Sequence, residues 1–227
     1  YACVRDFKEL EDWIDRAVKQ GFVAVDTETD SLDSVTANLV GVSLALAPNE
    51  ACYIPLAHVD PNDAGDGDMF GADPPRQVRM KDAIKALKPL LENDAVLKIG
   101  QNIKYDLNIF AQHGIQVAPI DDTMLLSYVL NAGKHGHGMD LLSEKYLGHT
   151  PLSFKDVAGS GKSQVTFDRV ALDKATEYAA EDADVTLRLW QTFKPLLHTE
   201  KVTTVYETEE RPLVPVLAAM ERSGVKV

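Results

Sequence analysis

Apolar residues recur along the chain at two spacings, one typical of β-strands and one typical of α-helices. Continuous or alternating apolar runs predict strands over residues 22–25, 39–47, 51–56, 95–99 and 115–117. Apolar positions three and four residues apart predict helices over residues 6–20, 77–91, 103–112, 122–130, 139–147, 168–197 and 206–222. An antiparallel meander, followed by strands that alternate with helices, predicts an α/β fold with a mixed sheet.

Glycine, proline and polar residues predict where the chain leaves regular structure. Residues 58–75 are rich in Asp, Gly and Pro and are predicted to form a surface loop, as are residues 131–138 and 153–166. Asn102 is a candidate N-cap for the helix over 103–112, and Pro195 is expected to bend or break the end of the long helix.

Two carboxylates follow directly on the first predicted strand. Asp26 and Glu28 are two residues apart, so both project from the same face of an extended chain. Like charges this close repel one another, and burying them costs free energy unless a cation compensates. A divalent metal ion is one explanation. A strand end that reaches solvent is the other, and a match this short does not decide between them.

Further carboxylates lie on predicted helix faces that are otherwise apolar. One stripe of the long helix consists of Ala171, Ala175, Tyr178, Asp182, Val185, Leu189 and Phe193. Asp106 lies on the inward side of the 103–112 helix, where the helix dipole alone would also favour an acid. Asp182 could equally cap another element or pair with a distant arginine. Together the four acids favour a metal site, and oxygen ligands suit Mg²⁺ or Mn²⁺ rather than zinc.

The composition is compatible with a metal site but does not require one. The chain has 227 residues, 45% of them hydrophobic, which suffices for one sizeable core. Its net charge of −12 is a poor match for phosphate groups, although bound metal ions would invert the local charge. An ordinary acidic surface explains the charge equally well.

The cysteines and the two ends of the chain bear on its setting. Two cysteines without CxxC spacing argue against a disulfide framework or a zinc site and favour a reducing cytoplasm. The sequence has neither a secretion signal nor an apolar run long enough for a membrane span. The missing initiator Met, and an end where a new strand could begin, suggest a piece of a longer protein.

Three motifs contain the four acids: VDTETDSL at 25–32, GQNIKYD at 100–106 and YAAEDAD at 178–184. With these motifs the sequence resembles the 3′-5′ proofreading exonuclease domain of bacterial family A DNA polymerases, the DNA polymerase I type. Tyr178 lies four residues before Asp182, a spacing typical of the tyrosine branch of the DEDD exonucleases. The similarity continues through residues 34–43, 122–128 and 162–167. The loops at 58–75 and 131–138 depart from the family pattern.

The resemblance implies a ribonuclease H-like fold and a two-metal hydrolysis with Mg²⁺ or Mn²⁺. On this basis Asp26 would bridge the two ions. Glu28 and Asp182 would complete the site for the attacking water, and Asp106 would hold the second ion. Tyr178 would orient the water, since a phenol is a poor general base near neutral pH. The product would be a 5′-mononucleotide.

The resemblance also implies contacts with DNA. Leu32 would wedge against the terminal base and Phe167 would stack on a base, although simple core packing explains either residue about as well. Gln101, Asn102 and Tyr105 would line the same cleft. Lys134, His135, Lys155 and Lys162 are candidates for phosphate contacts.

The same resemblance divides the chain and names its partners. Residues 1–205 would form the exonuclease domain, and residues 206–227 the truncated start of the polymerase domain, without a polymerase active site. The partners would be a single-stranded or frayed DNA 3′ end and the polymerase domain of the same parent chain. The protein would be a monomer in the bacterial cytoplasm, associated with the nucleoid. An RNase D-like or Werner-like exonuclease, and a catalytically silent bracing domain, are the alternatives.

Overall fold

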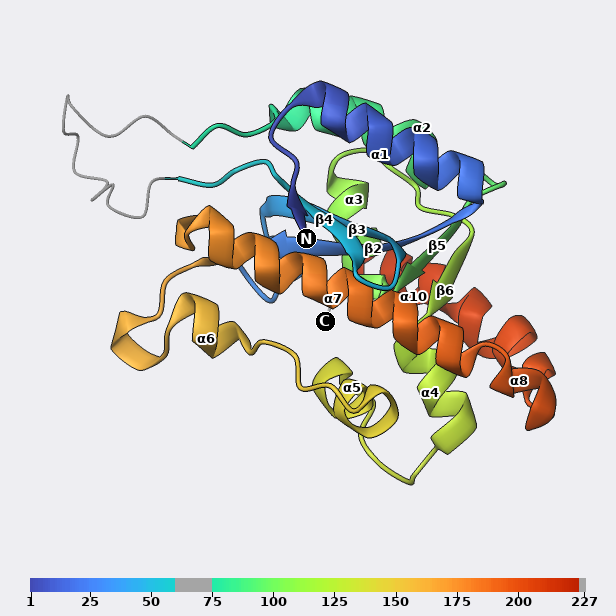
Figure 1. The fold of residues 1–227 in the computed structure, drawn as a ribbon. Helices are drawn as coiled ribbons and strands as arrows, with labels where there is room; N and C mark the ends of the chain where they lie inside the picture. Colours follow the sequence, from blue (N-terminus) through green and yellow to red (C-terminus); the bar gives the residue numbers. More distant parts are fainter. Residues whose placement is uncertain (60–74, 225–227) are drawn as a thin grey trace, which may run out of the picture.

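The computed structural model describes residues 1–59 and 75–224, so most of the 58–75 segment lies outside the described residues. A six-stranded sheet has the order β1-β4-β3-β2-β5-β6 (Figure 1). The antiparallel meander is formed by β2, β3 and β4, whereas β1, β5 and β6 pair in parallel with β4, β2 and β5. The strands are β1 (Ala2–Cys3), β2 (Phe22–Thr29), β3 (Leu39–Ala47), β4 (Glu50–Pro55), β5 (Leu97–Gly100) and β6 (Ile120–Asp122). The predicted mixed sheet is confirmed.

Helices cover both faces of the sheet (Figure 1). On one face lie α1 (Phe7–Gln20), α2 (Met80–Leu91) and α3 (Lys104–Gln112), which share the largest apolar core with the strands. The long helix α7 (Leu172–Phe193) crosses the other face and packs against β1 to β5. The remaining α-helices are α4 (Thr123–Asn131), α5 (Met139–Leu147), α6 (Phe154–Ala158), α8 (Leu196–Thr199), α9 (Thr203–Val205) and α10 (Arg211–Ser223).

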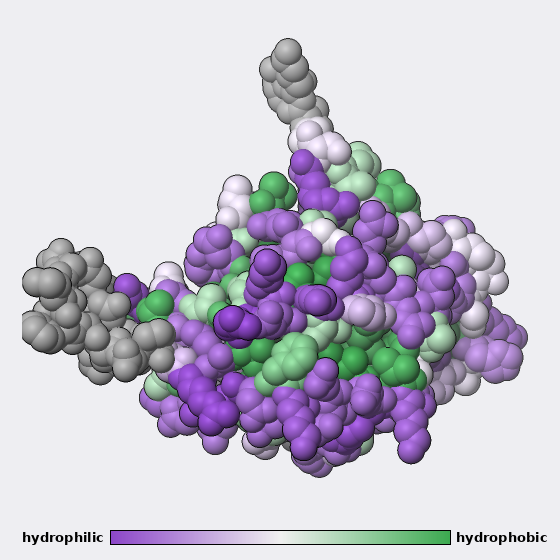
Figure 2. All heavy atoms as spheres, turned by 90° about the horizontal axis from the view of Figure 1, so that it is seen from above, coloured by the Kyte–Doolittle hydropathy of each residue, from purple (hydrophilic) through white to green (hydrophobic). Residues whose placement is uncertain are grey.

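The face over α1 and α2 is mainly hydrophilic, with hydrophobic side chains visible between the polar ones (Figure 2). Helix α1 begins where the Asp6 carboxylate accepts a hydrogen bond from the Glu9 amide at 3.0 Å. It ends at Gly21, whose φ of 84° is favourable for glycine. Among the described residues, no helix is long and apolar enough to cross a membrane.

Several predicted elements are wrong in position. The strand expected at 115–117 is absent, because Ile115 and Val117 are buried in the core without pairing, and the paired strand is β6. The predicted loop at 153–166 contains α6 and a single 3₁₀ turn, Gly161–Ser163. Strand β1 was not predicted. Pro195 does end the regular part of the long helix, since α7 ends at Phe193.

Asn102 is not the N-cap of α3. Its backbone has a left-handed φ of 57°, a conformation that asparagine tolerates better than most residues. The carboxylate of Asp122 instead accepts hydrogen bonds from the amides of Asn102 and Ile103, both at 3.0 Å. The same carboxylate accepts from Met124 at 2.9 Å and so caps α4. One side chain therefore organises the beginnings of two helices.

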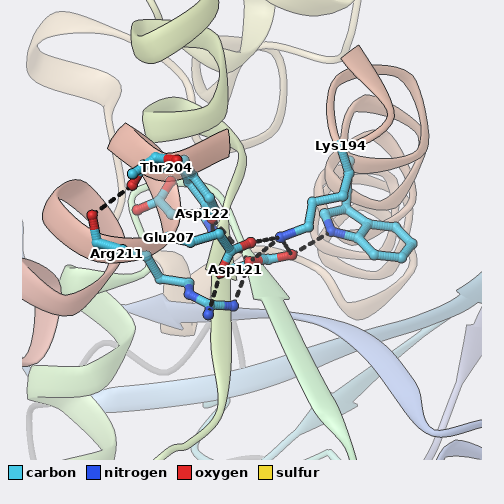
Figure 3. A network of polar contacts seen from close by, with 9 residues as sticks. Asp121, Asp122, Lys194, Thr204, Glu207 and Arg211 are labelled. Atoms are coloured by element: carbon cyan, nitrogen blue, oxygen red, sulfur yellow. Dashed lines mark hydrogen bonds and ion pairs between the residues drawn. The ribbon is translucent and has the colours of Figure 1, made fainter. Parts of the chain in front are cut away.

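A polar network attaches the C-terminal helices to β6 (Figure 3). The fully buried Asp121 accepts hydrogen bonds from Trp190 at 2.8 Å and from Tyr206 at 3.0 Å. Lys194 and Arg211 form salt bridges with Asp121, and both also pair with Glu207. Tyr206–Glu210 is a π-helical turn that delivers the tyrosine to this network. Two cations thus compensate one buried carboxylate.

Candidate active site

The first acidic pair lies on β2, which continues past the predicted apolar run to Thr29. Alternation along the strand places Asp26 and Glu28 on one face, opposite Ser43 and Gly41 of β3. The long helix brings Asp182 to the same place. One carboxylate oxygen from each of these three acids lies within 4.8 Å of the others. The structure therefore brings together three of the four predicted acids as one cluster.

The fourth predicted acid, Asp106, lies beside this cluster and outside it. Its carboxylate accepts a hydrogen bond from the Thr27 hydroxyl at 2.6 Å. Thr27 is between the paired acids in sequence, so it projects to the opposite face of β2, toward α3. Even so, Asp106 is close enough to Asp26 for that neighbouring charge to raise its pKa.

Burial makes ionisation of all four acids costly. It raises the pKa of Asp26 from 3.8 to about 7. It is also the largest cause of the high pKa values of Glu28, Asp106 and Asp182, and for each of these three the Asp26 charge is the next cause. Asp26 is therefore the carboxylate that the other three acids share as a neighbour.

This donor set fits a divalent cation. One carboxylate oxygen of Glu28, Oε1, is buried and has no hydrogen-bond partner within the described part of the chain. The neighbouring charges that act on Glu28, Asp106 and Asp182 are all carboxylates, so no residue that the structure describes supplies a compensating cation there. Hard oxygen ligands with excess negative charge suit Mg²⁺ or Mn²⁺. The arrangement can bind a phosphate group only with such ions in place.

A cleft of about 660 Å³ reaches two of the acids, Asp26 and Glu28, which line it together with Tyr178. Residues 154 and 164–167 also line this cleft. Burial, followed by the nearby carboxylates, strongly raises the pKa of the Tyr178 phenol. The tyrosine therefore keeps its proton across the physiological pH range and can donate a hydrogen bond at the acids.

Three of the predicted cleft residues, Leu32, Asn102 and Tyr105, line this cleft. Leu32 is 97% exposed, so core packing does not explain it. Phe167 also borders the cleft but is only 1% exposed, and its ring contacts those of Tyr53, His58, Phe154 and Tyr178. The packing interpretation of Phe167 therefore holds, whether or not its edge also meets a ligand.

The other predicted contacts lie farther from the acids. Gln101 does not line the cleft. Its amide donates to the carbonyl of His137 at 2.9 Å and so holds the 131–138 loop. His135 in that loop contacts Tyr146, and Lys134 is exposed. Lys155 is exposed on α6. Sequence reasoning missed Thr27 and Asp122, which touch Asp106 and the turn before α3. The only sequence signals were that Thr27 lies within the first motif and that Asp122 begins the similar stretch 122–128.

A family model described as 3′-5′ exonuclease matches residues 1–198. DNA polymerase I of Rhizobium leguminosarum is 54% identical, covering 100% of this chain and 23% of that protein. DNA polymerase I of Pseudomonas aeruginosa is 43% identical, with 100% and 24% covered. The chain spans about a quarter of the length of these relatives.

Solved structures of low identity share the fold. The POL domain of Pol1 from M. smegmatis, in complex with DNA primer-template and dNTP, has a TM-score of 0.74 at 16% identity, covering 100% of this chain and 33% of that one. Escherichia coli RNase D has a TM-score of 0.69 at 16% identity, covering 99% of this chain and 51% of that one. Brucella melitensis NrnC with bound Mg²⁺ has a TM-score of 0.66 at 20% identity, covering 92% of this chain and 88% of that one. These neighbours confirm the expected α/β, ribonuclease H-like exonuclease fold.

Proposed function

The chain belongs to the 3′-5′ exonuclease family found within bacterial DNA polymerase I, and on that basis we propose that it removes 5′-mononucleotides from the 3′ end of single-stranded or frayed DNA. The observation that carries the proposal is the cluster of Asp26, Glu28 and Asp182, with a buried oxygen that has no partner in the described part of the chain, beside a cleft that Asp26 and Glu28 line. Such a cluster is expensive to bury in any protein that does not bind cations there.

Two divalent ions, Mg²⁺ or Mn²⁺, would supply activation of water and stabilisation of charge on the leaving oxygen. Asp26 would contact both ions, because the other three acids all neighbour it. Glu28 and Asp182 would hold the ion beside the attacking water. Asp106, outside the tight cluster, would hold the second ion, with Thr27 fixing its carboxylate.

The remaining cleft residues would position the substrate. Tyr178 keeps its proton and would orient the attacking water by hydrogen bonding, without acting as a base. Leu32 would contact the terminal base, and Asn102 and Tyr105 would line the path of the strand. A mismatched DNA end frays more readily than a matched one, so delivery of frayed ends to this cleft would serve proofreading.

In its parent polymerase, this domain would act in the bacterial cytoplasm at DNA ends, as a monomer. The C-terminal segment 206–227 would lead into the polymerase domain, since the family match ends at residue 198. Helix α10 supports this, because it packs on α3 through Val214 and Ala218 and leaves apolar residues exposed on another side. These exposed residues are Leu213, Val216, Leu217 and Met220.

The test is hydrolysis of a 5′-labelled DNA single strand with Mg²⁺ or Mn²⁺, beside an RNA strand of matched sequence. Asp182→Asn should abolish release of mononucleotides. Asp173→Asn, an exposed acid at the start of the same helix, should leave it unchanged. Preference for RNA would favour the RNase D-like alternative. Equal activity of Asp182→Asn and the unaltered protein would refute the proposed site, and no activity in either would favour a silent bracing domain.

A further inference from the structure

Three polar side chains on α3 all bind the segment that carries Leu32. Tyr105 donates from its hydroxyl to the Ser31 carbonyl at 2.6 Å. Asn108 donates to the Ser34 hydroxyl and Gln112 to the Ser34 carbonyl, each at 3.0 Å. Their spacing of three and four residues places them on one side of the helix. The helix that bears Asp106 therefore also holds the turn at the cleft edge.

Asn108 lies between Tyr105 and Gln112 on this side of α3, and hydrogen bonds at its amide nitrogen and its amide oxygen fix its orientation. The residue is fully buried, and a buried asparagine on a core helix usually has hydrogen-bond partners for its polar atoms. Its amide nitrogen also donates to Glu221 of α10 at 2.9 Å. Its amide oxygen accepts from Arg222 of α10 at 2.7 Å. Because the oxygen faces an arginine, which can only donate, the assignment of the two amide atoms is settled.

The turn has no strand or helix of its own between residues 30 and 38, yet it is tied together internally. The carboxylate of Asp33 accepts from the Val35 amide at 3.0 Å and from the Thr36 hydroxyl at 2.8 Å. Asp30 and Asn38 close the base of the turn through two further hydrogen bonds. These bonds shape the turn, and the three polar side chains of α3 fix its position relative to the acids.

A fixed turn strengthens any contact that the exposed Leu32 makes with a ligand. Leu32 makes almost no contact with the protein, so its side chain contributes little to folding. A contact with a ligand is strongest when the turn does not have to be ordered on binding, since that ordering costs entropy. Holding the turn to the helix of Asp106 sets the distance between the leucine and the acids before a substrate arrives.

We propose that Asn108 and Gln112 are positioning residues for the reaction: they hold the Leu32 turn against α3 so that Leu32 meets the terminal residue of the substrate strand. Glu221 and Arg222 of α10 in turn hold Asn108. This inference rests on the proposed function, because it takes Leu32 to be a substrate contact.

A double-mutant cycle tests whether Asn108 acts through Leu32. We expect Leu32→Ala and Asn108→Ala each to lower kcat/KM on single-stranded DNA by about 5-fold or more, the scale of one lost base contact. In the Leu32→Ala background, Asn108→Ala should cause no further loss, since the residue that it positions is already gone. Multiplicative losses would overturn the proposal, because Asn108 would then act through Asp106 or through the fold.

Gln112→Ala keeps the proposal testable if removal of the buried amide unfolds the protein, because Gln112 is exposed. It should also lower kcat/KM, and not further in the Leu32→Ala background. The matched control is Gln20→Ala, since Gln20 likewise donates from a helix end to a backbone carbonyl, that of Leu46 at 2.9 Å. The control should leave kcat/KM unchanged. A loss with Gln20→Ala equal to that with Gln112→Ala would overturn the proposal.

Hydrogen–deuterium exchange separates this inference from the proposed function. Asn108→Ala and Gln112→Ala should speed amide exchange within residues 30–38, and Gln20→Ala should not. Unchanged exchange there would overturn the inference whatever the activity. Faster exchange with undiminished kcat/KM would overturn it too, while leaving the proposed function intact. If the unaltered protein released no mononucleotides, the proposed function would fail, and the exchange data would still decide whether α3 holds the turn.

Discussion

Replacement of Asp26 by asparagine should make the metal-free protein more stable at neutral and alkaline pH, although it should abolish nuclease activity. Burial raises the pKa of Asp26 from 3.8 to about 7. The folded protein therefore binds this proton more tightly than the unfolded chain does. The resulting stabilisation is complete below about pH 4 and is lost as the pH rises through about 7.

The size of the effect follows from the two pKa values. The interval between 3.8 and about 7, at about 1.4 kcal/mol per pH unit, corresponds to about 4 kcal/mol. Asparagine cannot ionise, so the variant avoids this cost, and above pH 8 the unaltered protein should be less stable than Asp26→Asn by roughly this amount. Relief of the charges on Glu28, Asp106 and Asp182 acts in the same direction.

The assay is urea unfolding in EDTA from pH 4.5 to 8.5, and the quantity of interest is the difference in unfolding free energy between the two proteins. The difference between the two proteins is needed because the stability that His58 contributes changes with pH in the opposite direction to that of Asp26. Burial lowers the pKa of His58 from 6.5 to about 4, so its contribution to stability is lost as the pH falls through that window. Because His58 is present in both proteins, its contribution cancels.

Addition of Mg²⁺ should narrow the difference, because the ions bind the folded unaltered protein and stabilise it by mass action. The reasoning is refuted if Asp26→Asn is no more stable than the unaltered protein at pH 8 in EDTA. It is refuted equally if the difference between the two proteins does not grow with pH.

Three further changes have expected outcomes. Asp121→Asn should destabilise the protein by about 1–3 kcal/mol in urea unfolding, the reverse of the effect at Asp26. Lys194 and Arg211 keep Glu207 but lose their buried acid, and Trp190 and Tyr206 lose a charged acceptor; a change below about 1 kcal/mol would contradict this. Tyr178→Phe should lower kcat by roughly 10- to 100-fold by freeing the attacking water, with Mn²⁺ affinity unchanged by calorimetry; an unchanged kcat would remove the tyrosine from the mechanism. Gly41→Ala should cost about 1–3 kcal/mol or more, measured by thermal unfolding, because a Cβ there would lie 2.1 Å from the Tyr53 hydroxyl oxygen; an unaltered melting temperature would show that the ring moves freely.

The sequence predicts this fold well where burial and periodicity coincide. Helices α1, α3 and α5 and strands β3 and β4 begin and end close to their predicted bounds, because their apolar residues face the core. Helix α7 lies within its predicted range but is four residues shorter at each end. Strand β6 could not be predicted in this way. Two of its three residues are aspartates, and their partners come from distant segments.

The candidate site divides in the same manner. The three clustered acids follow from strand alternation and helix spacing, since both are local rules. The position of Asp106 outside the cluster depends on its bond with Thr27, across two elements 79 residues apart, which no local pattern encodes. The left-handed backbone of Asn102 likewise depends on Asp122, whose carboxylate accepts a hydrogen bond from the Asn102 amide. The sequence therefore predicts an N-cap at Asn102 that the structure does not show.

Strand β6 is only three residues long, yet its last two side chains leave it in opposite directions. Asp121 binds the C-terminal helices, and Asp122 binds the turn that begins α3. The Tyr206 hydroxyl spans the pair, since it donates to the Asp121 carboxylate and accepts from the Asp122 amide. Through this one peptide, a continuous series of hydrogen bonds connects the C-terminal segment with the beginning of the helix that carries Asp106.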